Sequence, residues 1–374
     1  MPSRPRITLA RLSAECGVSV ATISNAFNRP DQLSKELREL VLKKAEELGF
    51  AGPDPAARSL RRGRVNAVGL LLGQTLSHAF SDPGTIVLLD GVARELQLRQ
   101  MSLLLVPSTG RAESDEQLVR NAVVDAWIAC ALDADDPVVD AVLQRRQPVV
   151  VLDQPDRAGL ALFSPDDVGG AREVVEHLVG LGHRRIGIVA TELVGDGLHG
   201  LASARRQARC TFATTRRRLR GARQAVEAAG LEWSSVPVVE AARNDQMAGS
   251  VAASLLLARR SPPSAIFAFT DELALGVLHA ARAAGLAVPD DVSVAGFDNM
   301  SGGRFADPPL TTVEQHLGER GLLAARALCE LIDGTAGVRS QVTATRLVVR
   351  ESTARPPGPG RGRRAALARA ATGP

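Results

Sequence analysis

The chain has 374 residues, of which 45% are hydrophobic and 23% charged, an ordinary composition for a globular protein of two or three domains. No apolar run approaches the roughly 20 residues that a membrane span requires, and the basic N-terminus has no apolar signal core, so we expect a cytoplasmic protein. The four cysteines (Cys16, Cys130, Cys210 and Cys329) lack the paired spacing of zinc sites or disulfides, and we expect neither a metal nor a cofactor.

The net charge of +4 is unevenly distributed. Residues 1–64 and residues 355–374 each carry a net charge of +5, and the residues between them carry −6. A basic head and tail on an acidic body indicate a polyanionic partner that is bound at the ends. Short basic segments are also common as solvated surface, so charge alone does not establish nucleic-acid binding.

Three short amphipathic segments open the chain. Thr8, Ser19 and Ser34 each stand where a side chain can cap the helix that follows, and Gly17 and Gly49 stand where the first and third helices would end. Two short helices separated by a glycine-containing turn, with a third to close the core, predict a helix-turn-helix head. So small a core predicts a head of marginal stability.

The next segments divide the rest of the chain. We expect the head to occupy residues 1–52 and a hinge helix with its linker to occupy residues 53–64. This hinge begins with Asp54 and Pro55, and it is too short to stay helical alone in water. Residues 65–354 would form the body, and residues 355–374, which are rich in Pro, Gly, Arg and Ala, would be disordered.

In the body, short continuous apolar runs alternate with helical stretches. Runs without polar alternation are typical of parallel strands that are buried on both faces of an α/β sheet. Eight such units over 290 residues suit two doubly wound lobes better than one sheet, with a ligand bound in the cleft at the carboxyl ends of the strands. The runs are 67–72, 102–106, 126–132, 148–152, 185–190, 236–239, 265–269 and 292–297.

The segment Ile7–Asn28 (ITLARLSAECGVSVATISNAFN) resembles the head of the lactose-repressor (LacI/GalR) family. Further family motifs follow in order, and the resemblance covers residues 7–353. They are Leu33-Ser34, Ala45–Phe50, Ala57–Leu60, Glu176–Leu178, Leu181–Ile186, Arg218–Gly221, Thr270–Gly276, Val294–Asp298, Pro309–Val313 and Arg350–Thr353. The resemblance implies an all-α helix-turn-helix head joined to an α/β, two-lobed, periplasmic-binding-protein-like effector domain.

The resemblance also implies a function. The chain would be a transcription regulator, and more specifically a repressor, that binds a pseudo-palindromic double-stranded operator as a homodimer or a higher oligomer. A small-molecule effector, a sugar or a sugar-like metabolite, would control its affinity for DNA. The identity of the effector, the operator sequence and the choice between repression and activation stay open.

The second helix carries the residues expected to read DNA. It would bury Ile23 and Phe27, four residues apart, and lay its outer surface in the major groove. The outward residues are Val20, Ala21, Ser24, Asn25 and Asn28. Asn can pair with adenine and small apolar side chains can contact a thymine methyl. Asn25 stands where many family members have Arg, so the operator would differ at that base step; alternatively, Asn25 is an ordinary surface residue.

Other residues are expected to contact the DNA backbone or the minor groove. Thr8, Ser19, Thr22 and Arg38 are placed for phosphates, which position the head without specifying sequence. The resemblance assigns Ala57 and Leu60 to a hinge helix in the minor groove, where Leu60 would insert between bases and kink the duplex. The alternative is that Leu60 packs against its own body.

For the effector, the resemblance points to Arg218 and Asp271, with Ser81, Asp82 and Asp166 as further candidates. Charged side chains suit the hydroxyls of a polyol, because hydrogen bonds to charged groups are the stronger kind. The chain departs from the family at two places. Gly84 and Thr85 stand where an aromatic pair is common, and no aromatic residue stands near Asn244.

Two other classes of protein are compatible with parts of the pattern. A solute-binding transport receptor shares the two-lobed fold, but it would need an export signal and would lack the head. An enzyme acting on a sugar or nucleotide could use Asp166, Asp167 and His177 as acid and base. The sequence has no phosphate-cradling loop, metal-ligand cluster or nucleophile motif, so we expect a regulator and not an enzyme.

Overall fold

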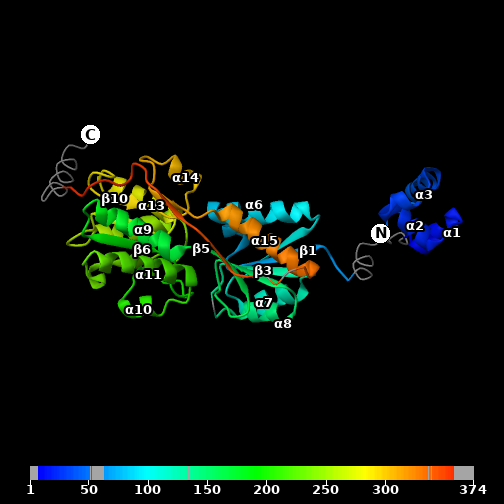
Figure 1. The fold of residues 1–374 in the computed structure, drawn as a ribbon, viewed down its shortest axis with the longest axis horizontal. Coiled ribbons are helices and arrows are strands. Elements are labelled where there is room, and N and C mark those ends of the chain that lie inside the picture. The colour runs from blue at the N-terminus through cyan, green and yellow to red at the C-terminus, as the bar shows by residue number, and fades with distance from the viewer. Residues whose placement is uncertain are drawn as a thin grey trace, which may run out of the picture. The chain divides into compact units, whose positions relative to one another are not determined.

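The computed structural model describes residues 7–50, 52, 63–133, 135–335, 337 and 339–357. The chain divides into two compact units between Val65 and Asn66. The first unit contains the head, and the second contains a body made of two α/β lobes (Figure 1).

The head is built from α1 (Leu9–Cys16), α2 (Val20–Asn28), the short 3-10 helix η1 (Pro30–Gln32) and α3 (Lys35–Glu47). Each α-helix starts at its predicted cap, because the side-chain oxygens of Thr8, Ser19 and Ser34 accept a backbone N–H three residues further on. Gly17 ends α1 in the left-handed region, with a φ of 65°, which favours glycine. The core consists of Leu12, Ile23, Ala26, Val41 and Ala45, with partly buried neighbours.

The first lobe is a six-stranded parallel sheet with the strand order β12-β5-β4-β3-β1-β2. Its strands are β1 (Ala67–Leu72), β2 (Ser102–Pro107), β3 (Ala126–Cys130), β4 (Val149–Leu152), β5 (Ala161–Pro165) and β12 (Gln341–Thr343). Its helices are α5 (Leu76–Ala79), α6 (Pro83–Leu98), α7 (Ala112–Asn121), α8 (Pro137–Gln144) and α15 (Leu317–Asp333). Helices α6 and α15 pack side by side (Figure 1), and a Cβ on Gly91 would lie only 1.9 Å from the Gly318 carbonyl oxygen.

The second lobe is a five-stranded sheet with the order β10-β9-β6-β8-β7. Its strands are β6 (Ile186–Ala190), β7 (Gly200–Leu201), β8 (Val238–Glu240), β9 (Ala265–Ala268) and β10 (Ser293–Ala295). Its helices are α9 (Asp167–Gly180), α10 (Ala204–Ala208), α11 (Ala213–Ala228), the 3-10 helix η2 (Trp233–Ser235), α12 (Gln246–Leu257), α13 (Asp271–Ala283) and α14 (Ser301–Arg304). Helices α9 and α11 pack together, as do α12 and α13.

Three described segments carry the chain between the lobes. They connect β5 to α9, β11 (Thr312–Glu314) to α15, and β12 to β13 (Arg346–Val348). Strands β11 and β13 form a small antiparallel ribbon. Because these crossings join the two lobes repeatedly, residues far apart in the sequence meet at the boundary between the lobes.

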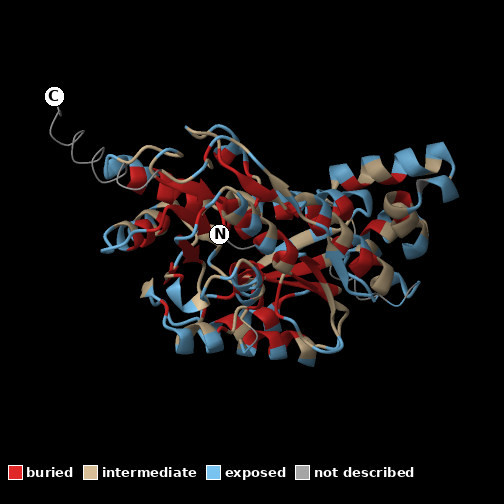
Figure 2. Cartoon of the chain, turned by 60° about the vertical axis from the view of Figure 1, so that its left-hand side comes forward, coloured by how far each residue is buried: buried red, intermediate tan, exposed pale blue. Residues whose placement is uncertain are grey.

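The two-lobed prediction is confirmed, and each of the eight predicted runs overlaps a strand. Figure 2 shows the buried positions concentrated along the sheets and on the inner sides of the helices. Strands β5, β7, β11, β12 and β13 were not predicted, because most span two or three residues and depend on their neighbours. Two details of the prediction are wrong: β7 runs antiparallel to β8, and β2 is an edge strand with Ser102 and Leu104 exposed.

Candidate functional site

Helix α2 presents the surface that the sequence assigned to DNA. Ile23 and Ala26 are buried in the core of the head, and Phe27 packs edge-on against Phe50 with 5.7 Å between ring centroids. This packing fixes which side of α2 faces outward. On that side Val20 and Ala21 are exposed, and the three polar residues Ser24, Asn25 and Asn28 are partly exposed.

The two asparagines of α2 are held by weak local contacts. Asn25 Nδ2 donates to Gln32 Oε1 at 3.4 Å, near the upper limit for a hydrogen bond. Asn28 Nδ2 donates to the Ser24 carbonyl at 2.8 Å. Both amides therefore have bonding capacity left for a base edge.

The residues predicted to contact phosphates lie at helix ends of the head. Thr8 caps α1, Ser19 caps α2, and the hydroxyls of Ser19 and Thr22 are 2.8 Å apart. Arg38 is exposed in the first turns of α3. The hinge residues Ala57 and Leu60 lie outside the described residues.

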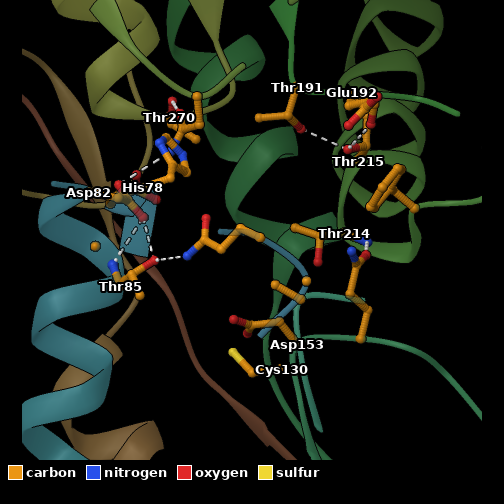
Figure 3. A pocket seen from close by; sticks show the side chains of 18 of the residues that line it. His78, Asp82, Thr85, Cys130, Asp153, Thr191, Glu192, Thr214, Thr215 and Thr270 are labelled. Atoms are coloured by element: carbon orange, nitrogen blue, oxygen red, sulfur yellow. Dashed lines mark hydrogen bonds between the residues drawn. The ribbon is translucent and has the colours of Figure 1, made fainter. Parts of the chain in front are cut away.

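The body contains a cavity of about 400 Å³ between its lobes. It lies at the carboxyl ends of the strands, as the sequence predicted, because Gly73, Ala131 and Asp153 follow β1, β3 and β4, and Thr191 follows β6. Figure 3 shows its labelled side chains: Asp82 and Thr85 lie on one side, Thr191, Glu192, Thr214 and Thr215 on the other, and Cys130 and Asp153 below them. Most of the side chains that line it are polar, and its ring-bearing residues are His78 and Phe212.

Arg218 is the buried cation of the cavity wall. Its Nε donates to Asp167 Oδ1 at 2.8 Å, its Nη1 donates to the Phe269 carbonyl, and its guanidinium lies 3.8 Å from the ring centre of Phe297. Asp167 also accepts from Arg217 Nε at 3.0 Å. Two arginines thus share one buried carboxylate, and this arrangement fixes the orientation of Arg218.

Asp82 anchors a chain of hydrogen bonds that crosses the cleft. Its Oδ2 accepts from the Thr85 backbone N–H at 3.1 Å, and this contact caps α6. Its Oδ1 accepts from Asn244 Nδ2 of the second lobe at 3.4 Å. The Thr270 hydroxyl in turn donates to Asn244 Oδ1 at 2.6 Å. A ligand in the cavity would meet these groups where the two lobes touch.

Two carboxylates that the sequence analysis did not select also line the cavity. Asp153 lies 3.0 Å from Arg320 Nε, and Asp298 Oδ1 accepts from Gln315 Nε2. Burial raises the pKa of Asp153, although Arg320 opposes the shift, and burial raises the pKa of Asp298 well above its ordinary value. A sequence signal existed for both, because Asp153 and Asp298 directly follow the apolar runs 148–152 and 292–297.

Of the predicted effector residues, the structure brings Asp82 and Arg218 together at the cavity. Ser81, Asp166 and Asp271 are not among the residues that line it. Ser81 is exposed and donates to the His78 carbonyl, and Asp166 caps α9 through the Gly169 N–H. Asp271 is fully buried behind the wall, where it accepts from the Thr312 hydroxyl at 2.5 Å and from the Met300 N–H at 2.7 Å.

Two searches of the described residues gave negative results. No helix in that part of the chain is long and apolar enough to cross a membrane. The same residues contain no group of three or more His, Cys, Asp or Glu side chains arranged to hold a metal ion.

A capped helix-turn-helix head on a two-lobed body with a polar cleft defines a ligand-responsive transcription regulator. The sequence comparisons agree. The chain is 41% identical over 324 residues to the HTH-type transcriptional regulator Rv3575c of Mycobacterium tuberculosis, covering 85% of this chain and 89% of that protein. It is 36% identical to the HTH-type transcriptional regulator IpsA of Corynebacterium glutamicum, covering 87% and 91%. The chain belongs to the LacI/GalR family of HTH-type transcriptional regulators.

Comparisons with a family and with solved structures support this assignment. Residues 175–353 match the periplasmic binding protein-like domain family. The complex of the transcriptional regulator CelR with cellobiose has a TM-score of 0.68 and 28% identity, covering 93% of this chain and all of that one. The lac repressor dimer, bound to operator and the anti-inducer ONPF, has a TM-score of 0.75 and 25% identity, covering 93% and 99%.

Proposed function

We propose that this chain is a repressor that binds a pseudo-palindromic operator as a homodimer and whose affinity for DNA is set by a small polyol in the cleft. The observation that carries the proposal is the pairing of two separate surfaces in one chain. One is the outward side of α2 in the head, and the other is the polar cavity of the body. Affinity for DNA depends on the ligand only if the ligand binds two states of the body unequally.

In the head, we assign base reading to the outer side of α2 and backbone contacts to its surroundings. Asn25 is the chief candidate, because its amide is partly exposed and only weakly bonded within the chain. Thr8, Ser19, Thr22 and Arg38 would hold phosphates, since they lie at helix starts where backbone N–H groups favour anions. Ala57 and Leu60 stay assigned to the minor groove on the sequence alone.

In the body, we assign direct effector contacts to Asp82 and Arg218, together with Asp153 and Asp298. Each of these side chains lines the cavity and offers a charged group that can bond a hydroxyl. Ser81, Asp166 and Asp271 would support the walls from outside the cavity. The solved CelR complex contains cellobiose, and this supports a sugar or a sugar-like effector here.

A homodimer is supported by an apolar stripe on α12. Met247, Val251 and Leu255 recur every four residues on this helix, and all three are exposed, Met247 by 74%. Residues four apart lie on one face of a helix, so the three form a continuous strip. Exposed apolar strips of this kind mark contacts between proteins. We propose that a second copy covers the strip, by analogy with the lac repressor dimer.

We further propose that the chain binds its ligand without converting it and that it acts in the cytoplasm, where a bacterial operator lies. The relatives reported above are named as transcriptional regulators. Incubation with candidate sugars separates the two classes: a sensor is stabilised by its ligand and returns it unchanged, whereas an enzyme releases a product.

The proposal is tested by selecting DNA bound by the full chain from a random pool. A pseudo-palindromic sequence is expected, and enrichment of no sequence would contradict the proposal. Asn25→Ala should then weaken binding to the selected operator by about 1–3 kcal/mol and relax one base step in each half-site. Glu46→Ala, which changes an exposed residue of α3, serves as the control and should leave both unchanged.

A further inference from the structure

The cavity between the lobes is lined by more acidic than basic side chains. Its carboxylates are Asp82, Asp153, Glu192 and Asp298, and its arginines are Arg218 and Arg243. Asp153 forms an ion pair with Arg320, whereas Asp82, Glu192 and Asp298 form no ion pair with a lysine or arginine in the described part of the chain. The unbalanced charge facing a ligand is therefore negative.

Both arginines of the wall are already engaged. Arg218 is bound by Asp167 and by the Phe269 carbonyl, with the ring of Phe297 against its face. Arg243 is mostly exposed, and its Nε donates to Asp245 at 2.8 Å. A phosphate or a carboxylate on the ligand would have to displace one of these partners, because a buried guanidinium keeps the carboxylate that compensates it.

The carboxylates of the wall are also partly removed from water. Burial raises the pKa of Asp153, Glu192 and Asp298. Charges that are poorly solvated interact more strongly with one another than charges in bulk water. A second anion placed among them would be repelled, whereas a group that donates hydrogen bonds would be attracted.

Two buried oxygens at the cavity have hydrogen-bonding capacity left. Among the described residues, Oδ1 of Asp153 and Oγ1 of Thr214 have no hydrogen-bond partner. A hydroxyl both donates and accepts, so it can satisfy a carboxylate and a threonine side chain at the same time. An anionic oxygen can only accept and cannot serve the carboxylate.

We propose that the effector is an uncharged polyol and that the cavity rejects its phosphorylated and carboxylated forms through Glu192 and Asp298. This inference rests on the proposed function, because it concerns the ligand of the same cavity. It adds a rule of discrimination: of two ligands with the same ring, the uncharged one binds.

The test compares matched ligands on the full chain. Melting temperature is measured with glucose, ribose and cellobiose, and with glucose 6-phosphate and ribose 5-phosphate, each at up to about 10 mM, because a ligand that binds the native state raises the melting temperature. At least one uncharged polyol should stabilise the chain, and its phosphate ester, where the panel holds one, should bind at least about tenfold more weakly.

Variants separate charge from size. Glu192→Gln keeps the shape of the wall and removes one charge, so it should narrow the gap between a sugar and its phosphate. Glu232→Gln, at an exposed residue outside the cavity, is the matched control and should leave the gap unchanged. A gap that stays the same in Glu192→Gln would show exclusion by size and overturn the inference.

The remaining outcomes are also decisive. A phosphate ester that binds more tightly than its parent sugar would overturn the charge rule and leave the proposed sensor function standing. Failure of every uncharged polyol to stabilise the chain would overturn the inference as well. If such a chain still bound its selected operator, only the DNA-binding half of the proposed function would survive.

Discussion

The side chains assigned to DNA and those that line the cavity lie in different surroundings. On α2, Asn25 and Asn28 are partly exposed and bonded to residues at most seven positions away. At the cavity, Arg218 and Asp167 are buried and joined across 51 positions of sequence. A change on α2 should therefore alter recognition with little effect on folding, whereas a change at the cavity wall also disturbs the core of the body.

The cores of the two regions differ in the same direction. The head encloses five buried apolar side chains, and the body holds several large clusters around its two sheets. In a small core each side chain carries a larger share of the stability. The head should therefore depend on single apolar residues, and the body on its buried charges.

The largest effect is expected for Asp167→Ala. This substitution leaves Arg217 and Arg218 without their shared carboxylate, and breaking a buried pair costs about 3–5 kcal/mol. Chemical denaturation of the body measures the loss. Asp140→Ala, which removes a mostly exposed partner of Arg157, is the control and should cost about 0–1 kcal/mol. Equal losses in the two variants would show that the buried cluster has no special weight.

The second effect concerns the head. Ile23→Ala opens a hole in the smallest core and should destabilise the head by about 2–5 kcal/mol. Hydrogen exchange on the full chain should then show lost protection in α1, α2 and α3 and unchanged protection in the sheets of the body. Leu40→Ala, at an exposed position of α3, should change exchange little. Loss of protection in the body would mean that the two regions do not unfold separately.

The third effect depends on pH. Burial raises the pKa of Asp271 to about 6 from an ordinary value near 3.8, so between these values the folded body holds a proton that the unfolded chain has lost. The contribution of Asp271 to stability is thus present below pH 4 and lost as the pH rises through about 6, a change on the order of 1–3 kcal/mol. Asp271→Asn should flatten this part of the pH profile of unfolding. An identical profile in the variant would exclude Asp271 as its source.

The smallest effect is expected for the cap of α2. Ser19→Ala removes the acceptor of the Thr22 N–H and should destabilise the head by about 1 kcal/mol. Faster hydrogen exchange at the start of α2 measures this change. Ser203→Ala, which removes the corresponding cap of α10 in the body, should leave the exchange of α2 unchanged. If Ser19→Ala also left it unchanged, the cap would be without weight in the head.

Sequence patterns predicted the fold better than the cavity. Continuous apolar runs located strands such as β1, because burial on both faces requires apolar residues at every position. Strand β12 is polar and exposed, with Gln341 and Val342 both outside the core, and only its pairing with β5 makes it a strand. Pairing of this kind depends on the lobe as a whole and leaves no local pattern.

The cavity shows the same limit at single residues. Asp166 and Asp167 are neighbours, yet the first caps α9 and the second holds Arg218, because the start of the helix turns one side chain to the backbone and the next inward. Asp271 matched a family motif but lies behind the wall, whereas Asp298 lines the cavity. Which carboxylate reaches a cleft is set by backbone direction at strand and helix ends, and composition does not reveal it.

The link between cavity and head is tested most directly by measuring both affinities on the full chain. Binding of the selected operator is measured with and without a saturating polyol that stabilises the body, and binding of the polyol with and without operator. Because coupling between two sites is reciprocal, both affinities should change by the same factor, about 5–150-fold. A polyol that binds in the cavity and leaves operator affinity unchanged would show that the cavity does not control the head.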